Sequence, residues 1–431
     1  MDNVHNEQVC RSDSCKKQSK ACRHDARVAV LTCKKDVESE LLRMGVSRAG
    51  TDIMSSKGVF RTVVVRDVPI KAALIIKQEM LAKGGEAALP YSAAGLSMES
   101  CDLLLMGTLR QYERVVATLL LQPFGLPAIA KQIECALVNY DKGPESMSFG
   151  GRTFLCGERT YIMGILNVTP DSFSDGGEHD TADSAFRHAM DMLEAGADII
   201  DIGGESTRPG ADPLPVDEEL QRVLPIVERL ASQTDAVISI DTYKAEVAER
   251  CLDFGAHIIN DVSALRGYGD MASVISRYNA PVVLMHSKGR PTHMQADPTY
   301  ECVVREVYGF LAERMAYACE RGISPCNIIL DPGIGFGKTP QHNLEIMRRL
   351  AEFKSLGRPI LMGTSRKSTI GKVLQKPVQD RIWGTAATVA MAIAAGADIV
   401  RVHDVAEMAM VARMTDAIIR GWRGEEDGHG S

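Results

Sequence analysis

The stretch SAFRHAMDMLEAGADIIDIGG, residues 184–204, decides the fold class of this chain. Its first half is a helical segment that ends in Gly-Ala, and its second half is an apolar run that ends in polar and glycine residues. A helix that stops at glycine and leads directly into a short buried strand is typical of α/β proteins. The stretch therefore predicts one helix–strand unit, followed by the glycine-punctuated loop GGESTRPGADPLP at residues 203–215.

The same unit recurs from about residue 155 to about residue 425. Helical segments such as DEELQRVLPIVERLAS, KAEVAERCLDFG and TAATVAMAIAAG alternate with apolar runs. The eight runs occupy residues 161–169, 197–204, 236–242, 257–264, 280–286, 327–335, 359–365 and 397–404. Eight βα units over about 270 residues fit a (β/α)8 TIM barrel, which we expect over residues 155–425. An open doubly wound sheet is the alternative, but the GxGxxG fingerprint that usually follows its first strand is missing.

Strand-like and helix-like patterns alternate before the barrel and predict a small α/β domain at residues 27–140. β-branched and apolar residues favour strands at 27–32, 59–68 and 102–108, and helical patterns occupy 70–85 and 108–122. We expect a flexible polar tail at 1–26 and a linker at 141–154. No catalytic constellation is visible in this domain, so its role stays open, and a partner-binding module is one interpretation.

The composition excludes some classes of protein. The 431 residues carry a net charge of −7, and lysines and arginines are spread along the chain, which argues against a general nucleic-acid binder. No apolar stretch reaches the ~18 residues that span a bilayer, so no membrane association is expected. The first residues contain no apolar region of a secretory signal, so we expect a cytoplasmic location.

Four of the eleven cysteines, Cys10, Cys15, Cys22 and Cys33, lie near the N-terminus together with His24. A metal site is conceivable there, but none of the spacings is a CxxC pair. Free thiols in a flexible tail are therefore the favoured interpretation, and the other cysteines are expected to be small core residues.

Ligands of TIM barrels bind at the carboxyl ends of the strands. In this sequence all eight ends finish in polar or charged groups, while the preceding positions are almost uniformly apolar. A polar residue after a strand is often a helix cap, and this interpretation is open for Asp261, Ser263 and Asp404. Carboxylates or amides at five ends and cations at two are hard to explain as caps, so we expect a functional pocket at one mouth.

Some of these side chains suit a flat heterocycle with an amino-amide edge, such as a pterin or guanine. Carboxylates pair well with adjacent ring N–H and exocyclic NH2 groups. The residues that offer these acceptors and donors are Asp241, Asn260, Asp331 and Lys367. Met285 and Phe336 are candidates to cover the faces of the ring.

Arg401 and His403 are two residues apart on one strand and therefore point the same way. Together with Asn167 they can hold a phosphate or a metal-bound phosphate. A satisfied packing histidine is the alternative for His403, but the arginine neighbour favours anion binding. The loops 167–180 and 203–215 are longer than minimal βα turns, and such loops can close over a ligand.

Eight segments of the chain, in order, resemble the motif set of the dihydropteroate synthase family, the folate-pathway enzymes that sulfonamides inhibit. They are GILNVTPDSFSDGG, DIGGESTRPGA, SIDTYKAEVA, INDVSA, LMH, DPGIGFGKT, GTSRKS and RVHDV. The resemblance implies that the amine of 4-aminobenzoate displaces pyrophosphate from (7,8-dihydropterin-6-yl)methyl diphosphate and forms 7,8-dihydropteroate. It also implies Mg²⁺ at the diphosphate, a homodimer, and a route in which the C–O bond breaks before the amine attacks.

The resemblance assigns roles position by position. The implied pterin pocket is Asp241, Asn260, Met285, Asp331, Gly363 and Lys367. The implied aminobenzoate site is Thr207, Arg208, Pro209, Phe336, Lys367 and Ser368. The implied diphosphate site is Asn167, Arg401 and His403, with Asn167 as the metal ligand. The groups expected to stabilise the cationic ring and the leaving group are Asp241, Lys367, Arg401 and His403.

The sequence is also compatible with two other functions. Folate- or methanopterin-dependent methyltransferases also bind a pterin in a (β/α)8 barrel, but they need no diphosphate clamp and no aminobenzoate pocket. The segments STRPG, SRKS and RVHD together favour the synthase. A pterin-binding protein without catalysis is the second alternative, which the complete set of site residues disfavours.

Overall fold

The computed structural model describes residues 26–95, 98–168, 178–205, 213–289 and 298–422. The chain divides into two compact units, Met1–Ile133 and Glu134–Ser431. Helix α6 (Leu126–Lys142) contains the boundary between them. No helix among the described residues is long and apolar enough to cross a membrane.

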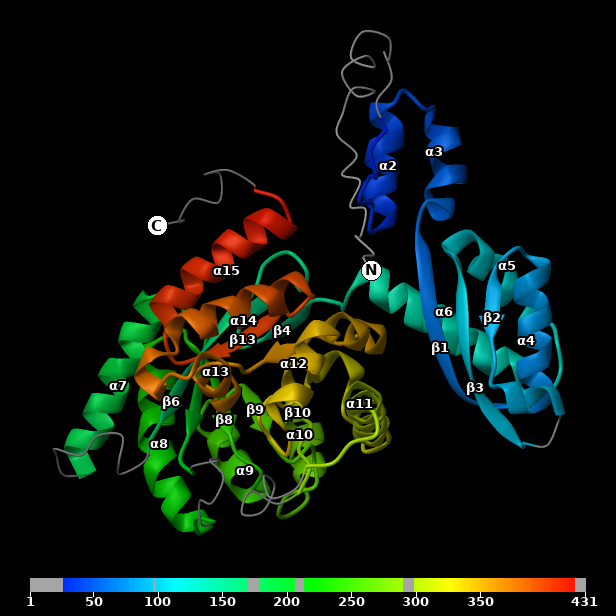
Figure 1. Ribbon diagram of the computed structural model, residues 1–431. Coiled ribbons are helices and arrows are strands. Elements are labelled where there is room, and N and C mark those ends of the chain that lie inside the picture. The colour runs from blue at the N-terminus through cyan, green and yellow to red at the C-terminus, as the bar shows by residue number, and fades with distance from the viewer. Residues whose placement is uncertain (1–25, 96–97, 169–177, 206–212, 290–297, 423–431) are drawn as a thin grey trace, which may run out of the picture. The chain divides into compact units, whose positions relative to one another are not determined.

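The first unit is built on a three-stranded antiparallel sheet. Its strand order is β1 (Phe60–Pro69), β3 (Ser100–Thr108) and β2 (Glu86–Ala88). Helices α4 (Ile70–Ala82) and α5 (Leu109–Leu119) pack against the sheet, and α2 (Lys34–Arg43) and α3 (Arg48–Met54) precede it (Figure 1). The strands expected at 59–68 and 102–108 and the helices expected at 70–85 and 108–122 are thus present.

One strand prediction in this unit is wrong. Residues 27–32 have no strand partner, and the side chains of Val28 and Val30 are exposed. β-branched residues favour a strand only where a neighbouring strand pairs with it and one face is covered. The described part of this segment has neither, and α2 begins two residues after its end.

The second unit is the predicted (β/α)8 barrel. Its parallel strands are β6 (Tyr161–Asn167), β7 (Ile199–Gly203), β8 (Val237–Asp241), β9 (Ile258–Asp261), β10 (Val282–Met285), β11 (Ile328–Asp331), β12 (Leu361–Met362) and β13 (Ile399–Val402). They form one eight-stranded sheet in the order β11-β10-β9-β8-β7-β6-β13-β12. A parallel bridge joins Leu330 of β11 to Ile360, the residue immediately before β12, and this pairing closes the barrel.

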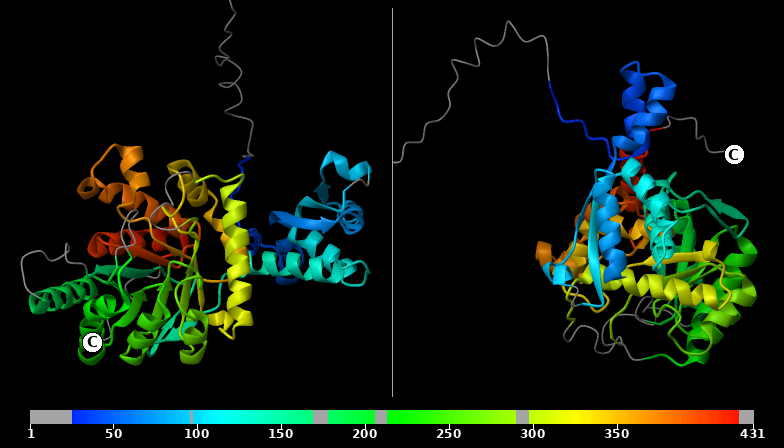
Figure 2. Two further views of the ribbon diagram at one scale, coloured as in Figure 1. Left: turned by 90° about the horizontal axis from the view of Figure 1, so that it is seen from below. Right: turned by 90° about the vertical axis from the view of Figure 1, so that its right-hand side faces the viewer.

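Helices surround the barrel strands (Figures 1 and 2). They are α7 (Glu178–Glu194), α8 (Val216–Gln233), α9 (Ala245–Asp253), α10 (Met271–Tyr278), α11 (Val303–Glu320), α12 (Pro340–Arg348), α13 (Ser368–Leu374), α14 (Ile382–Ala394) and α15 (Val405–Ile419). Every second strand residue packs outward against these helices in one large apolar core, as Ile200, Ile202, Ile238 and Ile240 do.

A β-hairpin covers the amino-terminal end of the barrel. Strands β4 (Met147–Phe149) and β5 (Arg152–Phe154) pair in antiparallel register, and their residues Met147 and Phe154 are buried against the first inward-facing residues of the barrel strands. The ring centroids of Phe154 and Tyr161 lie 4.7 Å apart. The segment 141–154, expected to be a linker, therefore contributes side chains to the barrel core.

Alternation along the strands explains where the polar residues go. The inner apolar layer consists of Met163, Ile199, Val237, Ile258, Val283, Ile329, Leu361 and Ile399. Successive side chains of a strand point to opposite faces, so residues two or four positions further on also point into the barrel. The barrel interior is thus apolar near the amino-terminal ends of the strands and polar at their carboxyl ends.

Candidate active site

The residues two or four positions beyond the inner apolar layer include most of those that the sequence assigns to a ligand, together with Asp201, Ser239 and Gly203, which it does not. Two positions on lie Asp201, Ser239, Asn260, Met285, Asp331, Gly363 and Arg401. Four positions on lie Asn167, Gly203, Asp241 and His403. The strand periodicity therefore brings residues that are up to 236 positions apart, from Asn167 to His403, to one mouth.

Arg401 is the centre of the polar network in this mouth. Its Nε donates a hydrogen bond to Oδ2 of Asp201 at 2.6 Å, and its Nη2 donates to Oδ2 of Asp241 at 2.7 Å. Burial opposes the charge of the guanidinium, but Asp201 and Asp241 together raise the pKa of Arg401 above its usual value. Arg401 is therefore a fixed cation held between two carboxylates.

The second carboxylate oxygen of Asp241 has no partner. Its Oδ1 is buried, and no described residue donates a hydrogen bond to it. A buried acceptor without a donor costs about 1–3 kcal/mol. Burial also raises the pKa of Asp241, and the charge of Arg401 opposes this rise. A ligand that brings an N–H group to this oxygen would remove the penalty.

Asn260 lies beside Asp241 in the paired strands β8 and β9. Its Nδ2 donates to Oδ2 of Asp201 at 3.0 Å, and Ser239 Oγ donates to Oδ1 of Asp201 at 2.6 Å. Asp201 is completely buried, so it contacts these side chains and not the solvent in the mouth. The sequence marks Asp201 as a strand end but does not single it out as a site residue.

The loop after β11 is held in a tight conformation. Oδ1 of Asp331 accepts a hydrogen bond from the backbone N–H of Gly333 at 2.7 Å. Gly333 has φ +69°, and a Cβ atom there would lie 1.9 Å from the backbone oxygen of His286. Only glycine fits both the left-handed backbone and this close approach. Burial raises the pKa of Asp331.

Lys367 and Phe336 lie together at the mouth. The Nζ atom of Lys367 lies 4.2 Å from the centroid of the Phe336 ring, within the range of a cation–π interaction. Burial, together with the charge of Arg401, lowers the pKa of Lys367 to about 8. Lys367 is thus protonated at neutral pH but close to its titration range.

A second buried lysine organises the same loop. The Nζ atom of Lys338 donates to the backbone oxygens of Gly333 at 2.8 Å and Phe336 at 3.1 Å, and lies 2.8 Å from Nδ1 of His286. Burial lowers the pKa of Lys338 to about 7. Burial and the neighbouring Lys338 lower the pKa of His286 to about 2, so His286 is a neutral acceptor. The residue pattern of the sequence does not indicate this contact between Lys338 and His286.

His403 is also neutral. Burial and the charge of Arg401 lower its pKa to about 4. Nδ1 of His403 lies 3.0 Å from Oγ of Ser365, which also accepts a hydrogen bond from the backbone N–H of His403. If the Ser365 hydroxyl donates to Nδ1, Nε2 carries the ring proton and can donate to a ligand.

Two glycines leave space in the mouth. A Cβ atom on Gly363 would meet only Cβ of Arg401, at 3.8 Å, and one on Gly203 would lie 3.6 Å from Cβ of Asp241 and 3.7 Å from Oδ1 of Asn167. Neither glycine has a positive φ, so the backbone does not require them. The absence of a side chain at these two positions leaves room above Arg401 and Asp241.

A buried ion cluster joins the residues on either side of segment 206–212, in the loop after β7. Lys244 Nζ contacts the carboxylates of Glu205 and Glu219 and the backbone oxygen of Leu214. Glu205 also accepts a hydrogen bond from the hydroxyl of Tyr243 at 2.8 Å. Glu205 and Leu214 flank residues 206–212, so Lys244 connects the two ends of that segment.

The structure brings together the site residues that it describes. Asp241, Asn260, Met285, Asp331, Gly363, Lys367, Arg401, His403, Asn167 and Phe336 lie at the strand ends or in the loops that follow them. Ser368 is exposed and is the first residue of α13. Thr207, Arg208 and Pro209 lie outside the described residues. Asp261 accepts hydrogen bonds from the backbone of Ser263 and Leu265 and is thus a loop-capping residue.

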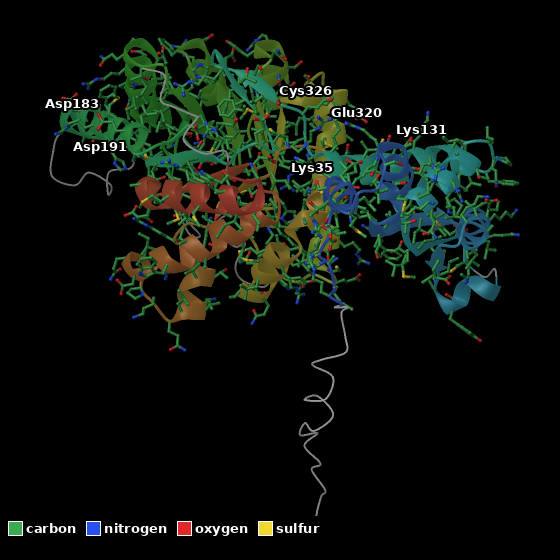
Figure 3. All side chains as sticks on the ribbon, turned by 90° about the horizontal axis from the view of Figure 1, so that it is seen from above. Lys35, Lys131, Asp183, Asp191, Glu320 and Cys326 are labelled. Carbon is green, nitrogen blue, oxygen red and sulfur yellow. The ribbon has the colours of Figure 1, made fainter. Side chains whose placement is uncertain are left out.

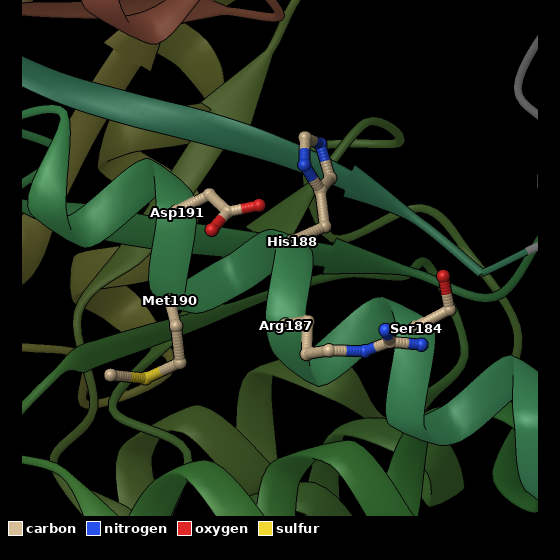
Figure 4. Close-up of a pocket in the computed structure, with 5 residues that line it drawn as sticks. All are labelled: Ser184, Arg187, His188, Met190 and Asp191. Atoms are coloured by element: carbon tan, nitrogen blue, oxygen red, sulfur yellow. The ribbon is translucent and has the colours of Figure 1, made fainter.

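A surface hollow of about 360 Å³ lies elsewhere (Figure 4). It is lined by Ser184, Arg187, His188, Met190 and Asp191, all of which belong to α7. Asp183 and Asp191 project from this same helix (Figure 3). None of these residues stands at the carboxyl end of a strand. The hollow brings together no groups from different strands, and we place the site at the barrel mouth.

Comparisons with known proteins show which family the second unit resembles. The pterin binding enzyme family matches residues 163–403. A dihydropteroate synthase from Synechocystis is 47% identical over 284 residues, which are 66% of this chain and 97% of the relative. The crystal structure of a Clostridium difficile dihydropteroate synthase in the presence of pteroic acid is 52% identical, with a TM-score of 0.59, over 62% of this chain and 98% of that one. A Yersinia pestis synthase solved with a sulfonamide drug is 42% identical, with a TM-score of 0.60, over 63% and 98%.

Two relatives also match part of the first unit, and one of them illustrates the extent of the match. A probable bifunctional folylpolyglutamate synthase/dihydropteroate synthase from Halobacterium salinarum is 43% identical over 389 residues. These are 90% of this chain and 46% of the relative. Because the match is longer than the second unit alone, it extends well into the first unit. The first unit is therefore not unique to this chain.

Proposed function

The chain belongs to the pterin-binding enzyme family, and we infer that it is a dihydropteroate synthase. It condenses (7,8-dihydropterin-6-yl)methyl diphosphate with 4-aminobenzoate to 7,8-dihydropteroate and pyrophosphate. The observation that carries this inference is the unpaired Oδ1 of Asp241 beside Arg401, in a mouth that also contains Asn260, Asp331 and Lys367. This set offers acceptors and cations for a donor-bearing heterocycle that carries an anionic group.

The pterin ring would lie over the strand ends in the space that Gly203 and Gly363 leave open. Its 2-amino and ring N–H groups are donors, and carboxylate oxygens such as Oδ1 of Asp241 are the acceptors that they require. A buried carboxylate would also stabilise the positive charge that develops on the ring when the C–O bond breaks. Met285 is buried beneath this position, and Phe336 is half-buried in the loop beside it.

The diphosphate would be held by Arg401 through its remaining donors and by Nε2 of His403. Mg²⁺ is the proposed metal, with the side chain of Asn167 as its protein ligand. Oδ1 of Asn167 is next to the open space above Gly203, and it is an oxygen donor of the kind that Mg²⁺ prefers. Among the described residues no three acidic, histidine or cysteine side chains form a ready-made metal cage, which fits an ion bound mainly by substrate oxygens. Bound there, Mg²⁺ would neutralise charge on the leaving diphosphate.

The second substrate would approach from the side of Lys367 and Phe336. The bond between the pterin methylene carbon and the diphosphate oxygen breaks first and pyrophosphate leaves with the electron pair. The nitrogen of 4-aminobenzoate then forms the new C–N bond to that carbon, and the amine loses one proton. An aromatic amine is an adequate nucleophile toward a carbocation, so no strong general base is needed. The aminobenzoate carboxylate would pair with nearby donors of α13, where Ser368 is the exposed first residue. A sulfonamide would occupy the same place.

The test is pyrophosphate release by the purified full chain with the dihydropterin diphosphate and Mg²⁺, with and without 4-aminobenzoate. Release that requires 4-aminobenzoate and yields dihydropteroate supports the assignment. Pterin binding without release would favour a catalytically silent pterin-binding protein. Methyl transfer from methyltetrahydrofolate would instead favour the methyltransferase alternative. Asp241→Ala and Lys367→Ala are expected to abolish turnover and serve as matched negative controls.

We further propose that the barrel forms a homodimer through α14 and α15. These helices expose large apolar side chains, among them Trp383, Met391, Met410, Met414 and Ile418. An apolar surface of this kind is typical of a protein–protein interface. Sedimentation analysis of the full chain and of Met414→Glu would test this proposal, since a charge in the interface should yield monomers. The cytoplasmic location stays a prediction from the sequence.

A further inference from the structure

Asp201 is a buried carboxylate that contacts two ligand-binding side chains at once. Its Oδ2 accepts hydrogen bonds from Nε of Arg401 at 2.6 Å and from Nδ2 of Asn260 at 3.0 Å. Its Oδ1 accepts from Oγ of Ser239 at 2.6 Å. The three donors come from β13, β9 and β8, so this residue of β7 ties four strands together beneath the mouth. Asp201 has no exposed surface and can act on a ligand only through these partners.

The contact with Asp201 fixes the orientation of the Asn260 amide. The two ends of an amide group differ in chemistry, since NH2 donates and the oxygen accepts. Asp201 in its ion pair with Arg401 is a carboxylate, which only accepts, so Asn260 must direct its NH2 group toward it. No described residue donates a hydrogen bond to Oδ1 of Asn260, so this oxygen is left as an acceptor.

The same contact orients Arg401. Asp201 takes Nε and Asp241 takes Nη2, and no described residue accepts a hydrogen bond from Nη1. Asp201 thus fixes the guanidinium plane and leaves one donor group for a ligand anion. Because Arg401 also occupies Oδ2 of Asp241, it leaves Oδ1 of Asp241 as the second unpaired acceptor beside Asn260.

We propose that Asp201 is a positioning residue that determines specificity for a heterocycle edge bearing hydrogen-bond donors. It presents two acceptors to the ligand, Oδ1 of Asn260 and Oδ1 of Asp241. This inference rests on the proposed pterin site and deepens it. An amide at position 201 could donate as well as accept, so Asn260 could turn over and present NH2 to the ligand. The mouth would then also accept a 2-oxo ring, whose edge carries an acceptor where a pterin carries its amino group.

The experiment measures binding of 6-hydroxymethylpterin and of its 2-oxo analogue, 6-hydroxymethyllumazine, to the full-length protein by titration calorimetry. The wild type is expected to prefer the pterin by at least tenfold, about 1.4 kcal/mol. Asp201→Asn is expected to reduce this preference at least fivefold. Ser239→Ala is the matched control, because it removes a partner of Asp201 that faces neither ligand group, and it should keep the wild-type preference.

A merely structural role for Asp201 would weaken both ligands equally and leave their ratio unchanged, and this result would overturn the inference. If Asp201→Asn does not fold, as judged by its melting curve, Asp201→Ala removes the acceptor without adding a donor, and the same fall in the ratio is expected. Steady-state kinetics add a second readout. The KM for the dihydropterin diphosphate should rise in Asp201→Asn while the KM for 4-aminobenzoate stays unchanged. A wild type that binds neither pterin nor lumazine would instead refute the proposed function itself.

Discussion

Replacement of Lys244 by methionine should both destabilise the barrel and weaken aminobenzoate binding. The side chains of Lys244 and Glu219 are 5% and 1% exposed, and their ion pair is accompanied by Glu205 and the backbone oxygen of Leu214. Removing one partner of a buried pair leaves an uncompensated charge, which costs about 3–5 kcal/mol. Each kcal/mol of lost folding free energy lowers the melting temperature by about 2–4 °C in domains of about 150–250 residues, and somewhat less in a larger domain such as this barrel. We therefore expect the melting temperature to fall by at least about 5 °C.

Differential scanning calorimetry of the full chain measures this effect. The barrel transition is the one that moves upward when a pterin is added, because a ligand of the folded state stabilises it. Arg277→Met is the matched control. Its ion pair with Glu249 is exposed, at 57% and 40%, and its loss should cost less than about 1 kcal/mol. Equal melting temperatures for Lys244→Met and Arg277→Met would show that the buried ion cluster does not stabilise the barrel.

The functional part of this prediction follows from the position of the cluster. Lys244 joins Glu205 to Leu214, the residues that flank the segment with Thr207, Arg208 and Pro209. We therefore expect the KM for 4-aminobenzoate to rise by about tenfold, which corresponds to about 1.4 kcal/mol, while pterin affinity changes little. The double variant with Glu219→Leu should be more stable than the single variant, because the unpaired buried carboxylate is then gone. A strictly additive loss would contradict the proposed coupling.

Three further predictions concern the mouth. Because burial lowers the pKa of Lys367 to about 8, kcat/KM for the pterin substrate should fall as pH rises through 8, and Lys367→Arg should remove that decrease; an unchanged profile contradicts a role for the Lys367 charge. Gly333→Ala should destabilise by more than Gly151→Ala in thermal melts, because both glycines have φ +69° but only Gly333 has a carbonyl, that of His286, in the way. Gly363→Val should weaken pterin binding in calorimetry at an unchanged melting temperature, and full affinity would show that the ring lies elsewhere.

Much of the architecture follows from local sequence patterns. The eight strands of the barrel are short apolar runs that end in polar groups, and alternation alone decides which side chains face inward. Asp241, Asn260 and Arg401 could be assigned to one mouth in this way, because the strand ends of a TIM barrel meet there. The hairpin at Met147–Phe154 could not be predicted in this way, because each of its strands has only three residues and the sequence there resembles a linker. Its place in the core depends on the contact between Phe154 and Tyr161, which only the structure shows.

The contacts between side chains of different strands could not be predicted from the sequence. Asp201 and Arg401 are 200 residues apart, and the pattern of each strand alone does not say that one carboxylate serves both Arg401 and Asn260. The same holds for Lys338, whose four acceptors depend on how the loop after β11 turns at Gly333. The strand predicted at 27–32 failed for the converse reason, because β-branched residues there have no neighbour to pair with.

The most direct test of the central claim is identification of the product by mass spectrometry, using the full chain with dihydropterin diphosphate, Mg²⁺ and 4-aminobenzoate labelled with ¹⁵N. We expect 7,8-dihydropteroate that carries the label, one pyrophosphate for each molecule formed, and no product from Asp241→Asn or Arg401→Gln. Unlabelled pterin products, or undiminished turnover by these two variants, would contradict the assignment of the condensation to the barrel mouth.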